Sequence, residues 1–235
     1  MNLFYDPAAR AGHFDLAEAE ARHIVQVLRR KVGDVIQLVD GQGGHWQGPI
    51  IEASKRSCSL DLQLLHQQDQ RADYRLRLLV APTKQIDRLE WLLEKATEIG
   101  IDSIQPVLCR YSERKQIRTD RLQRVLESAM KQSLQTWLPE LQPLLPLEEA
   151  LAQADDAVKL MAYIHPEVRS PIRDNYQPGQ SVCILVGPEG GLHPEEAALA
   201  TQQGYKSVWL GPNRLRTETA ALYAVQTVAS LNLPT

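Results

Sequence analysis

The fold of this chain is decided by the stretch Val182-Cys183-Ile184-Leu185-Val186-Gly187-Pro188-Glu189-Gly190-Gly191. A short apolar run ends abruptly at Gly-Pro, which predicts a buried strand that stops in a glycine loop. The pattern recurs at Val208-Trp209-Leu210-Gly211-Pro212, and each loop leads into a stretch with helical character. Strand, glycine loop and helix, twice in succession, are typical of an α/β protein that holds a ligand against bare backbone at the carboxyl ends of its strands.

The second loop carries a dense set of chemical groups. It continues as Leu215-Arg216-Thr217-Glu218-Thr219-Ala220. Thr217 as N-cap and Glu218 as a first-turn acid facing the helix dipole would account for two of these residues. That interpretation gives no use for Arg216 or for Gly211. The first loop alone is equally compatible with a structural turn, because it has neither the Lys-Ser/Thr of a phosphate loop nor the spacing of a dinucleotide fingerprint.

Together, the two loops resemble those of the ribosomal small subunit methyltransferase E family, a branch of the SPOUT methyltransferases. Members of this family methylate N3 of a uridine in 16S ribosomal RNA, using S-adenosylmethionine. The likeness extends over essentially the whole chain, in the family's order, through the motifs Arg22-His23 with Val27-Leu28-Arg29 and Gly33-Asp34, Lys95-Ala96-Thr97-Glu98-Ile99-Gly100, and Gln132-Ser133. Each motif alone is weak, but the ordered set is specific.

The resemblance implies a fold and an assembly. We expect an α/β domain with a mostly parallel sheet and a C-terminal trefoil knot, preceded by a small PUA-like β-barrel domain that binds RNA. The domains are expected at residues 1–70 and 74–235, separated by the polar stretch around Gln67–Asp73. Active sites of this superfamily form between two subunits, so we expect a homodimer. Its surfaces are expected at the Gln132-Ser133 helix and the last helix.

The resemblance also implies a cofactor site without metal. Glycines allow close approach of a bent cofactor, since side chains would block it. Backbone groups beside them are candidates for contacts with adenine and ribose. The expected cofactor-binding residues are Val186, Gly187, Gly190, Gly191, Leu210, Gly211, Leu215, Arg216 and Ala220.

The expected reaction gives Arg216 and Glu218 catalytic roles. Uridine N3 carries a proton and is a poor nucleophile until that proton leaves, so a base or a stabilising cation is required. Glu218 fits as base or orienting group, and Arg216 fits as the cation. Arg216 could equally hold a phosphate or the cofactor carboxylate.

Three departures from the family pattern stand out. Gln135 occupies the place of an arginine after Gln-Ser, and Asn213-Arg214 replaces Arg-Ile before the Leu-Arg-Thr-Glu-Thr motif. His193 stands where a Ser or Thr would cap the helix after the first glycine loop.

Composition indicates a globular protein of the reducing cytoplasm. The chain has 235 residues, of which 43% are hydrophobic and 23% charged. It contains neither an apolar run long enough to span a membrane nor an N-terminal pattern typical of a signal peptide. Cys58, Cys109 and Cys183 are far apart and, like the six histidines, form no metal-binding spacing. His23 is expected to be structural rather than an RNA contact, and His165 to lie near the cofactor loop.

Charge segregation favours a polyanion partner despite the net charge of −3. The segment 22–31 has four basic residues and no acid, and 110–124 has six basic residues against Glu113 and Asp120. Solvated surface charge would be the alternative explanation. Tyr111 is expected to stack on a base. The expected RNA contacts are Arg22, Arg29, Arg30, Lys31, Arg110, Arg114 and Lys115.

Periodicity predicts the individual elements. Helices are expected at 17–30, 86–100, 119–137 and 217–231, with Pro139 stopping the third. Strands are expected at 35–39, 46–51, 57–64, 76–81, 104–108 and 157–162, and Gly41-Gln42-Gly43-Gly44 is expected to form a hairpin turn.

The sequence is also compatible with two other functions. One is a SPOUT methyltransferase acting on transfer RNA or on a ribose 2′-hydroxyl, for which an arginine near the first strand–helix junction would be needed; Lys84 and Arg88 leave this open. The other is an RNA-binding assembly factor without catalysis, which the presence of both Arg216 and Glu218 disfavours. The sequence specifies neither the target nucleotide nor whether free RNA or an assembled subunit is the substrate.

Overall fold

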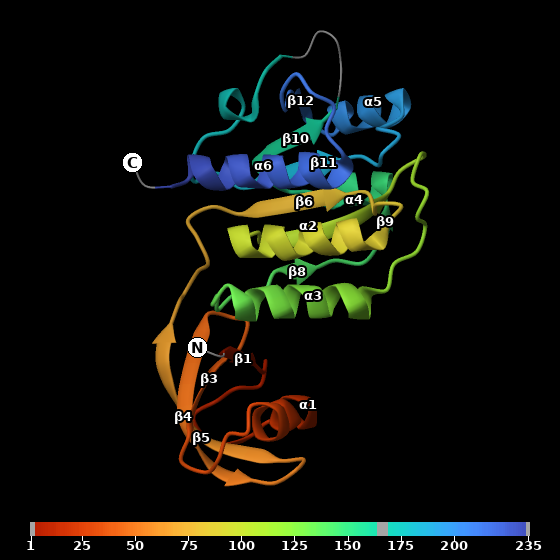
Figure 1. The fold of residues 1–235 in the computed structure, drawn as a ribbon. Helices are drawn as coiled ribbons and strands as arrows, with labels where there is room; N and C mark the ends of the chain where they lie inside the picture. The colour runs from red at the N-terminus through yellow and green to blue at the C-terminus, as the bar shows by residue number, and fades with distance from the viewer. Residues whose placement is uncertain (1–2, 164–168, 234–235) are drawn as a thin grey trace. The chain divides into compact units, whose positions relative to one another are not determined.

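The chain folds into two compact units, as seen in a computed structural model that describes residues 3–163 and 169–233 (Figure 1). Unit 1 comprises Met1–Arg71 and Glu127–Leu138, and unit 2 comprises Ala72–Leu126 and Pro139–Thr235. The end of a helix from the middle of the chain therefore belongs to the small unit, whereas the sequence places it in the second domain.

Unit 1 is built on a five-stranded sheet in the order β1-β3-β4-β5-β2. The predicted hairpin between β3 and β4 is present, and Gly41 and Gly43 adopt φ of 75° and 93° in its turn. The Asp40 carboxylate holds this turn, accepting hydrogen bonds from Gly44 N (2.9 Å) and Trp46 Nε1 (3.0 Å). Sequence periodicity did not predict β1 and β2, the two shortest strands of this sheet. The strands are β1 (Leu3–Tyr5), β2 (Gly12–Asp15), β3 (Val35–Val39), β4 (Gly44–Ala53) and β5 (Cys58–Gln67).

The helix predicted at 17–30 is shorter and less regular than expected. It consists of α1 (Glu18–Arg22) and a π-helical turn, η1 (His23–Val27). Arg29 has a φ of 55°, in the left-handed region, which a continuing α-helix excludes. Arg29, Arg30 and Lys31 consequently lie in an exposed loop that follows the helix.

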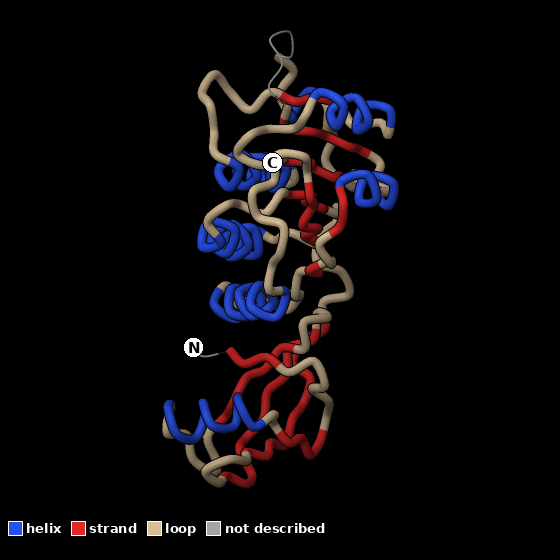
Figure 2. The backbone as a smooth tube through the Cα atoms, turned by 90° about the vertical axis from the view of Figure 1, so that its right-hand side faces the viewer, coloured by secondary structure: helices blue, strands red, loops and turns tan. Residues whose placement is uncertain are grey.

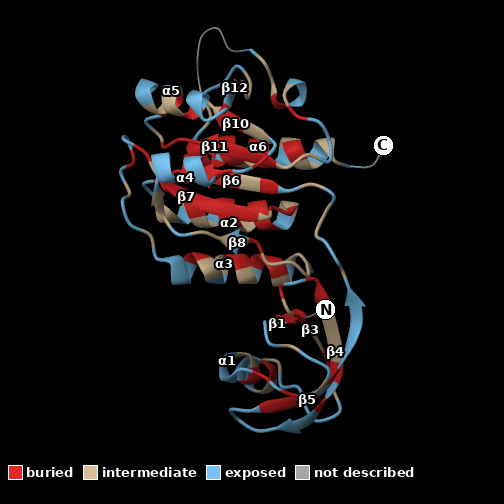
Figure 3. Ribbon diagram, turned by 180° about the vertical axis from the view of Figure 1, so that it is seen from behind, coloured by how far each residue is buried: buried red, intermediate tan, exposed pale blue. Residues whose placement is uncertain are grey.

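Unit 2 contains a seven-stranded sheet in the order β12-β10-β11-β6-β7-β8, with β9 paired to β7. Every pairing among these strands is parallel, as predicted. All five residues of β11 are buried, because helices cover both faces of the sheet (Figure 3). The strands are β6 (Leu76–Val80), β7 (Ser103–Leu108), β8 (Glu140–Leu141), β9 (Leu145–Pro146), β10 (Val158–Ala162), β11 (Val182–Val186) and β12 (Lys206–Val208).

Helices form a layer on each side of this sheet (Figure 2). α2 (Ile86–Ile99) packs against α6 (Thr217–Leu231), which also contacts β6 and β11. α4 (Leu147–Gln153) and α5 (Pro194–Gln202) contact each other over a core that includes Leu185 and Tyr205. A short 3₁₀ turn, η2 (Ile172–Asp174), lies in the connection between β10 and β11. The short α4 and the two-residue strands β8 and β9 were not predicted.

The helix α3 (Thr119–Gln132) ends five residues before its predicted end at Trp137. Leu134 adopts a φ of 57°. The N–H groups of Leu134 and Gln135 donate to the carbonyls of Lys131 and Met130, which is the Schellman pattern of a helix end. A left-handed leucine therefore stops the helix before Pro139 can. No helix in the described ranges is long and apolar enough to cross a bilayer.

Candidate functional site

The two glycine loops meet at one edge of the unit 2 sheet. β10 pairs in parallel with both β11 and β12, so the strands that precede the loops end at the same edge. The Thr217 hydroxyl, at the start of α6, donates a buried hydrogen bond of 3.1 Å to the Gly187 carbonyl. This bond ties the second loop and its helix to the first loop. The structure thus brings the first glycine loop into contact with the start of α6.

The four glycines of these loops fall into two pairs. Gly191 and Gly211 have φ of 79° and 118°, and a Cβ built on either would meet no atom of the described residues within 4 Å. A Cβ on Gly187 would lie 3.0 Å from the Leu192 side chain, and one on Gly190 would lie 2.9 Å from the Tyr111 Cβ. Gly191 and Gly211 therefore offer open backbone to a ligand, whereas Gly187 and Gly190 are already required by contacts within the protein.

Some of the expected backbone contacts are occupied by internal hydrogen bonds. The Val186 carbonyl accepts from Ala81 N (3.1 Å), and the Ala220 N–H donates to the Arg216 carbonyl (2.8 Å). Leu210 and Leu215, in the second loop, are both half-buried. A carbonyl can accept a second bond, but the Ala220 N–H is used within α6.

Arg216 and Glu218 differ sharply in their surroundings. Arg216 is exposed at the N-cap of α6, and its side chain makes no capping hydrogen bond among the residues described. Glu218 is only 7% exposed, and its Oε1 lies 3.8 Å from Nε of Arg88 in the first turn of α2. The other carboxylate oxygen, Oε2, is buried without a hydrogen-bond partner among the described residues. A buried acceptor in this state is unusual and marks Glu218 as a candidate for a functional contact.

His193 replaces the expected Ser or Thr cap without loss of capping. Its ring accepts from Glu195 N (3.3 Å), while the Glu196 carboxylate accepts from His193 N (2.8 Å), which completes a capping box at the start of α5. The Arg110 guanidinium donates to His193 and to Glu195, the latter at 2.8 Å. This departure from the family pattern is therefore accommodated locally.

The expected RNA contacts are in varied environments. Arg22 pairs with Glu18 on α1, and Arg110 pairs with Glu195. Arg114 is half-buried and donates to two backbone carbonyls. Lys115 is exposed, at a polar hollow of ≈ 530 Å³ that it shares with Lys84, Glu113, Arg114 and Gln116. Nothing in the local sequence indicated that Arg110 and Arg114 would form hydrogen bonds within the protein.

Thiols and histidines contribute no metal centre in the described ranges. No group of three or more His, Cys, Asp or Glu side chains there could hold a metal ion. Burial raises the pKa of Cys109 and of Cys183 to about 12, so both remain neutral thiols. His165, which was expected near the cofactor loop, lies outside the described residues.

Comparison with known proteins covers both units. A model of the RNA methyltransferase domain matches residues 70–229, and a model of the RNA methyltransferase PUA domain matches residues 16–63. The chain is 30% identical over 229 residues to the ribosomal RNA small subunit methyltransferase E of Rickettsia conorii, spanning 95% of this chain and 92% of that protein.

Two solved structures are similar over nearly the full length. The "probable rRNA-methyltransferase" from Porphyromonas gingivalis has a TM-score of 0.89 at 39% identity and covers 99% of this chain and 98% of its own. The ribosomal RNA small subunit methyltransferase E from Neisseria gonorrhoeae has a TM-score of 0.84 at 28% identity, with 99% and 98% covered. That protein was crystallised with bound S-adenosylmethionine.

Proposed function

Because this chain belongs to the ribosomal RNA small subunit methyltransferase E family, we propose that it methylates N3 of a specific uridine in 16S ribosomal RNA, using S-adenosylmethionine. The observation that carries this proposal is the hydrogen bond from Thr217 to Gly187. It joins two loops whose open, left-handed glycines, Gly191 and Gly211, leave backbone accessible at the edge of the sheet.

The residues present fit S-adenosylmethionine. Open backbone at Gly191 and Gly211 allows a ligand to approach closely, and the expected neighbours Leu210 and Leu215 provide half-buried apolar surface. When bound, the cofactor supplies a methyl group on a sulfonium, ready for in-line transfer. Val186, Gly187 and Gly190 have contacts within the protein that hold the first loop, and Ala220 lies in the first turn of α6.

Arg216 and Glu218 would act on the uridine. Glu218 has a buried oxygen that no described residue hydrogen-bonds, and this oxygen can accept a proton or hydrogen bond from N3. Arg216 is exposed beside it at the start of α6 and can stabilise the negative charge left on the base. Its alternative roles, holding a phosphate or the cofactor carboxylate, use the same exposed position.

RNA binding is proposed at exposed basic residues of each unit. In unit 1 these are Arg22 and the loop residues Arg29, Arg30 and Lys31, which are all exposed. In unit 2, Lys115 is exposed, while Arg110 would have to exchange its bonds to His193 and Glu195 for a phosphate. Contacts of this kind provide affinity rather than base specificity.

The C-terminal knot is also part of the proposal. β12 lies beyond β10 at the edge of the sheet, whereas α6 packs on β11, β6 and α2. Segment 209–216 therefore passes over the carboxyl ends of neighbouring strands, and Trp209 N donates to Ser170 O in the β10–β11 connection (2.9 Å). This path supports threading of the C-terminal segment.

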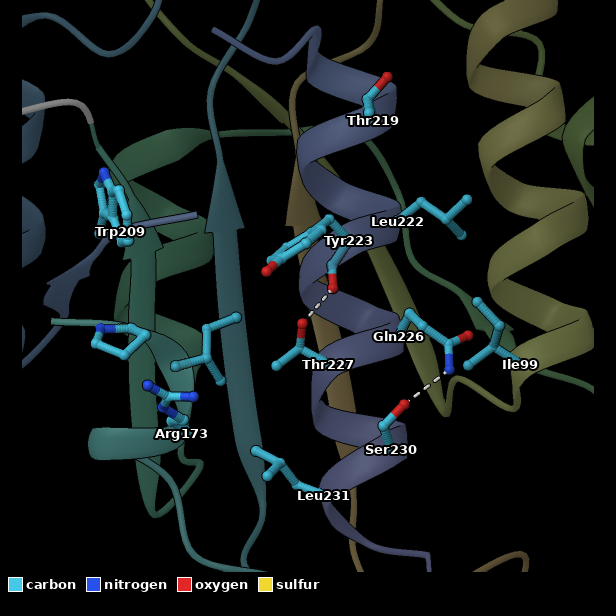
Figure 4. Close-up of a pocket in the computed structure, with 12 residues that line it drawn as sticks. Ile99, Arg173, Trp209, Thr219, Leu222, Tyr223, Gln226, Thr227, Ser230 and Leu231 are labelled. Carbon is cyan, nitrogen blue, oxygen red and sulfur yellow. Dashed lines mark hydrogen bonds between the residues drawn. The ribbon is translucent and has the colours of Figure 1, made fainter. Parts of the chain in front are cut away.

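A homodimer is proposed through the outer face of α6. A hollow of ≈ 620 Å³ lies between this helix and the η2 segment (Figure 4). Leu222 and Tyr223 line it, and Tyr223 is 51% exposed. Exposed aromatic surface of this kind is typical of protein interfaces. Since ribosomal RNA is the proposed substrate, the cytoplasm is the proposed location.

Mapping of modified nucleosides tests this function. Mass spectrometry of 16S ribosomal RNA from a strain lacking the gene is expected to show loss of one N3-methyluridine, restored by the wild-type gene. Loss of a ribose methylation, or of a transfer RNA modification, would instead support the related SPOUT activities. If every modification persists but subunit assembly fails, the chain is an assembly factor.

A further inference from the structure

The loop between β6 and α2 is held from two sides by charged residues. Nε and Nη2 of Arg114 donate to the carbonyls of Thr83 (3.0 Å) and Lys84 (2.7 Å). Across the same peptide, the Lys84 N–H donates to Oε1 of Glu189 at 2.9 Å. One guanidinium and one carboxylate thus hold the peptide between Thr83 and Lys84 through both its carbonyl and its amide group.

The hydrogen bonds from Arg114 and to Glu189 form a brace on the Thr83–Lys84 segment. Because Glu189 belongs to the first glycine loop, this brace acts on the proposed cofactor site. It is the one charged residue in Gly187-Pro188-Glu189-Gly190-Gly191. Its carboxylate points back to the β6–α2 loop, and Thr83 in that loop is fully buried. A shift of Thr83 and Lys84 would therefore be transmitted to the glycine loop through Glu189.

The segment 109–116 also contacts the first glycine loop directly, at Gly190. The Tyr111 Cβ lies against Gly190, so closely that an added Cβ there would be 2.9 Å away. The Tyr111 ring also meets His193 edge-on, with centroids 5.7 Å apart. Tyr111 and Arg114 consequently reach the same loop by two routes, one direct and one through the β6–α2 loop.

Arg114 is suited to this role by its shape. A guanidinium has several donors in a rigid fork and can bond two neighbouring carbonyls at once, whereas the compact ammonium of lysine cannot match that geometry. Both bonds are charge-assisted, which makes them stronger than neutral ones. Two N–H groups of Arg114, which were expected to contact RNA, therefore donate to backbone carbonyls of this chain instead.

We propose that Arg114 and Glu189 are positioning residues that act through the Thr83–Lys84 backbone to hold the glycine loop in the shape that accepts the cofactor. This inference rests on the proposed function for the identity of the cofactor. It changes the role of Arg114 from a phosphate contact to a support of cofactor binding. Lys115, exposed at the same hollow, keeps the RNA role.

Charge-preserving and charge-removing variants separate these roles. Arg114→Lys keeps the charge but breaks the two-carbonyl clamp, and we expect the S-adenosylmethionine Kd from calorimetry to rise about tenfold. Arg114→Met and Glu189→Leu should raise it similarly, because each removes its hydrogen bonds to the Thr83–Lys84 segment. The double variant should be little worse than the stronger single one, because both residues act through one peptide.

RNA affinity is measured on the same variants, with two comparisons. Arg124→Met removes one positive charge, together with an exposed ion pair to Asp120, from α3 and reports the cost of losing a surface charge that contacts no loop backbone in the described part of the chain. Arg114→Met should lower RNA affinity no more than this control does. Lys115→Met should have the opposite profile from Arg114→Lys, with weaker RNA binding and an unchanged cofactor Kd. The proposal is overturned if Arg114→Lys binds cofactor like wild type, or if Arg114→Met loses RNA affinity well beyond Arg124→Met.

Amide hydrogen exchange tests the brace independently of any ligand. In the full-length protein without cofactor, Arg114→Lys should accelerate exchange at Lys84 and across residues 187–191, while Arg124→Met should not. Unchanged exchange in Arg114→Lys overturns the proposal. Faster exchange in a protein whose wild type binds no S-adenosylmethionine would keep the brace and reject the proposed function.

Discussion

Arg88 and Glu218 form an ion pair between α2 and α6, with Nε of the arginine 3.8 Å from Oε1 of the glutamate. The Glu218 side chain is 10% exposed and that of Arg88 is 30% exposed. The pair gives Glu218 a structural partner, while its second oxygen has no hydrogen-bond partner in residues 3–163 and 169–233. The carboxylate can therefore link two helices and still accept a bond from a substrate.

Glu218→Gln should separate the catalytic role from the structural one. The substitution keeps shape but removes the proton acceptor, so we expect kcat to fall about a hundredfold with little change in RNA affinity. Raising the pH should partly restore the rate, because solvent can then remove the N3 proton. Single-turnover methylation of 16S ribosomal RNA across a pH series measures both effects.

Arg88→Met is the matched control for Glu218→Gln. It removes the same ion pair but leaves the carboxylate, so turnover should fall much less. Equal rate losses in the two variants, accompanied by equal losses in thermal stability, would reduce Glu218 to an interhelical link and first-turn acid.

Gly191→Ala should weaken cofactor binding beyond the cost of its backbone strain. Gly191 and Gly204 have φ of 79° and 89°, and within the part of the chain that the structure describes a Cβ at either would meet no atom within 4 Å. Alanine at either position should therefore lower stability by about 1–2 kcal/mol. Only Gly191→Ala should raise the S-adenosylmethionine Kd in calorimetry, since Gly204 follows α5 away from the loops. Equal cofactor affinity in the two variants would remove Gly191 from the site.

Thr217→Val tests the bond that joins the two loops. Valine keeps the volume but leaves the Gly187 carbonyl without its buried donor, which should cost about 1–3 kcal/mol in denaturant unfolding. Cofactor affinity should fall as well, because the loops are no longer tied. Thr201→Val, which loses a hydroxyl bond to Ala197 within α5, is the control and should leave the cofactor Kd unchanged. Similar Kd values in both variants would indicate that the tie is dispensable.

The sequence was sufficient for features that depend on local pattern. The apolar run of β11 and the Gly-Pro that follows it predicted a buried strand and a loop, and the α6 limits agree with the structure. Helix ends set by unusual conformations were missed, because Arg29 and Leu134 adopt positive φ without being glycine. Nothing local marks a residue that a distant turn will hold in that region.

Contacts between segments that are far apart in the sequence could not be predicted from local sequence pattern either. The basic segment 110–124 predicted RNA contacts, but its Arg114 donates to carbonyls some thirty positions earlier in the chain. The Arg88–Glu218 pair likewise joins residues that are far apart in the sequence, one in α2 and one in α6. Such pairings depend on which loops the parallel sheet brings to one edge, and a charge pattern cannot specify them.

The exposed loop at Arg29, Arg30 and Lys31 should govern RNA affinity independently of the cofactor. Replacing all three by glutamine should weaken RNA binding and lower the slope of log affinity against log salt by about 0.7–0.9 per lost phosphate contact. The S-adenosylmethionine Kd should not change. These point changes are preferable to deletion of residues 1–70, because Met130 of α3 packs with Leu3 and Val39 and would lose that core. An unaltered salt slope would exclude the loop from the interface.

Tyr223→Asp should convert a dimer into a monomer. Tyr223 is 51% exposed on the outer face of α6 and lines the hollow beside η2. In a monomer an aspartate there would be solvated at little cost, whereas in an interface it would be an unpaired buried charge, which is strongly unfavourable. Leu64→Asp, at a 45% exposed position on β5, supplies the matched control. Sedimentation equilibrium should show a dimer for wild type and Leu64→Asp and a monomer for Tyr223→Asp, with methylation lost in the monomer if both subunits build the site. A dimer that persists in Tyr223→Asp would place the interface elsewhere.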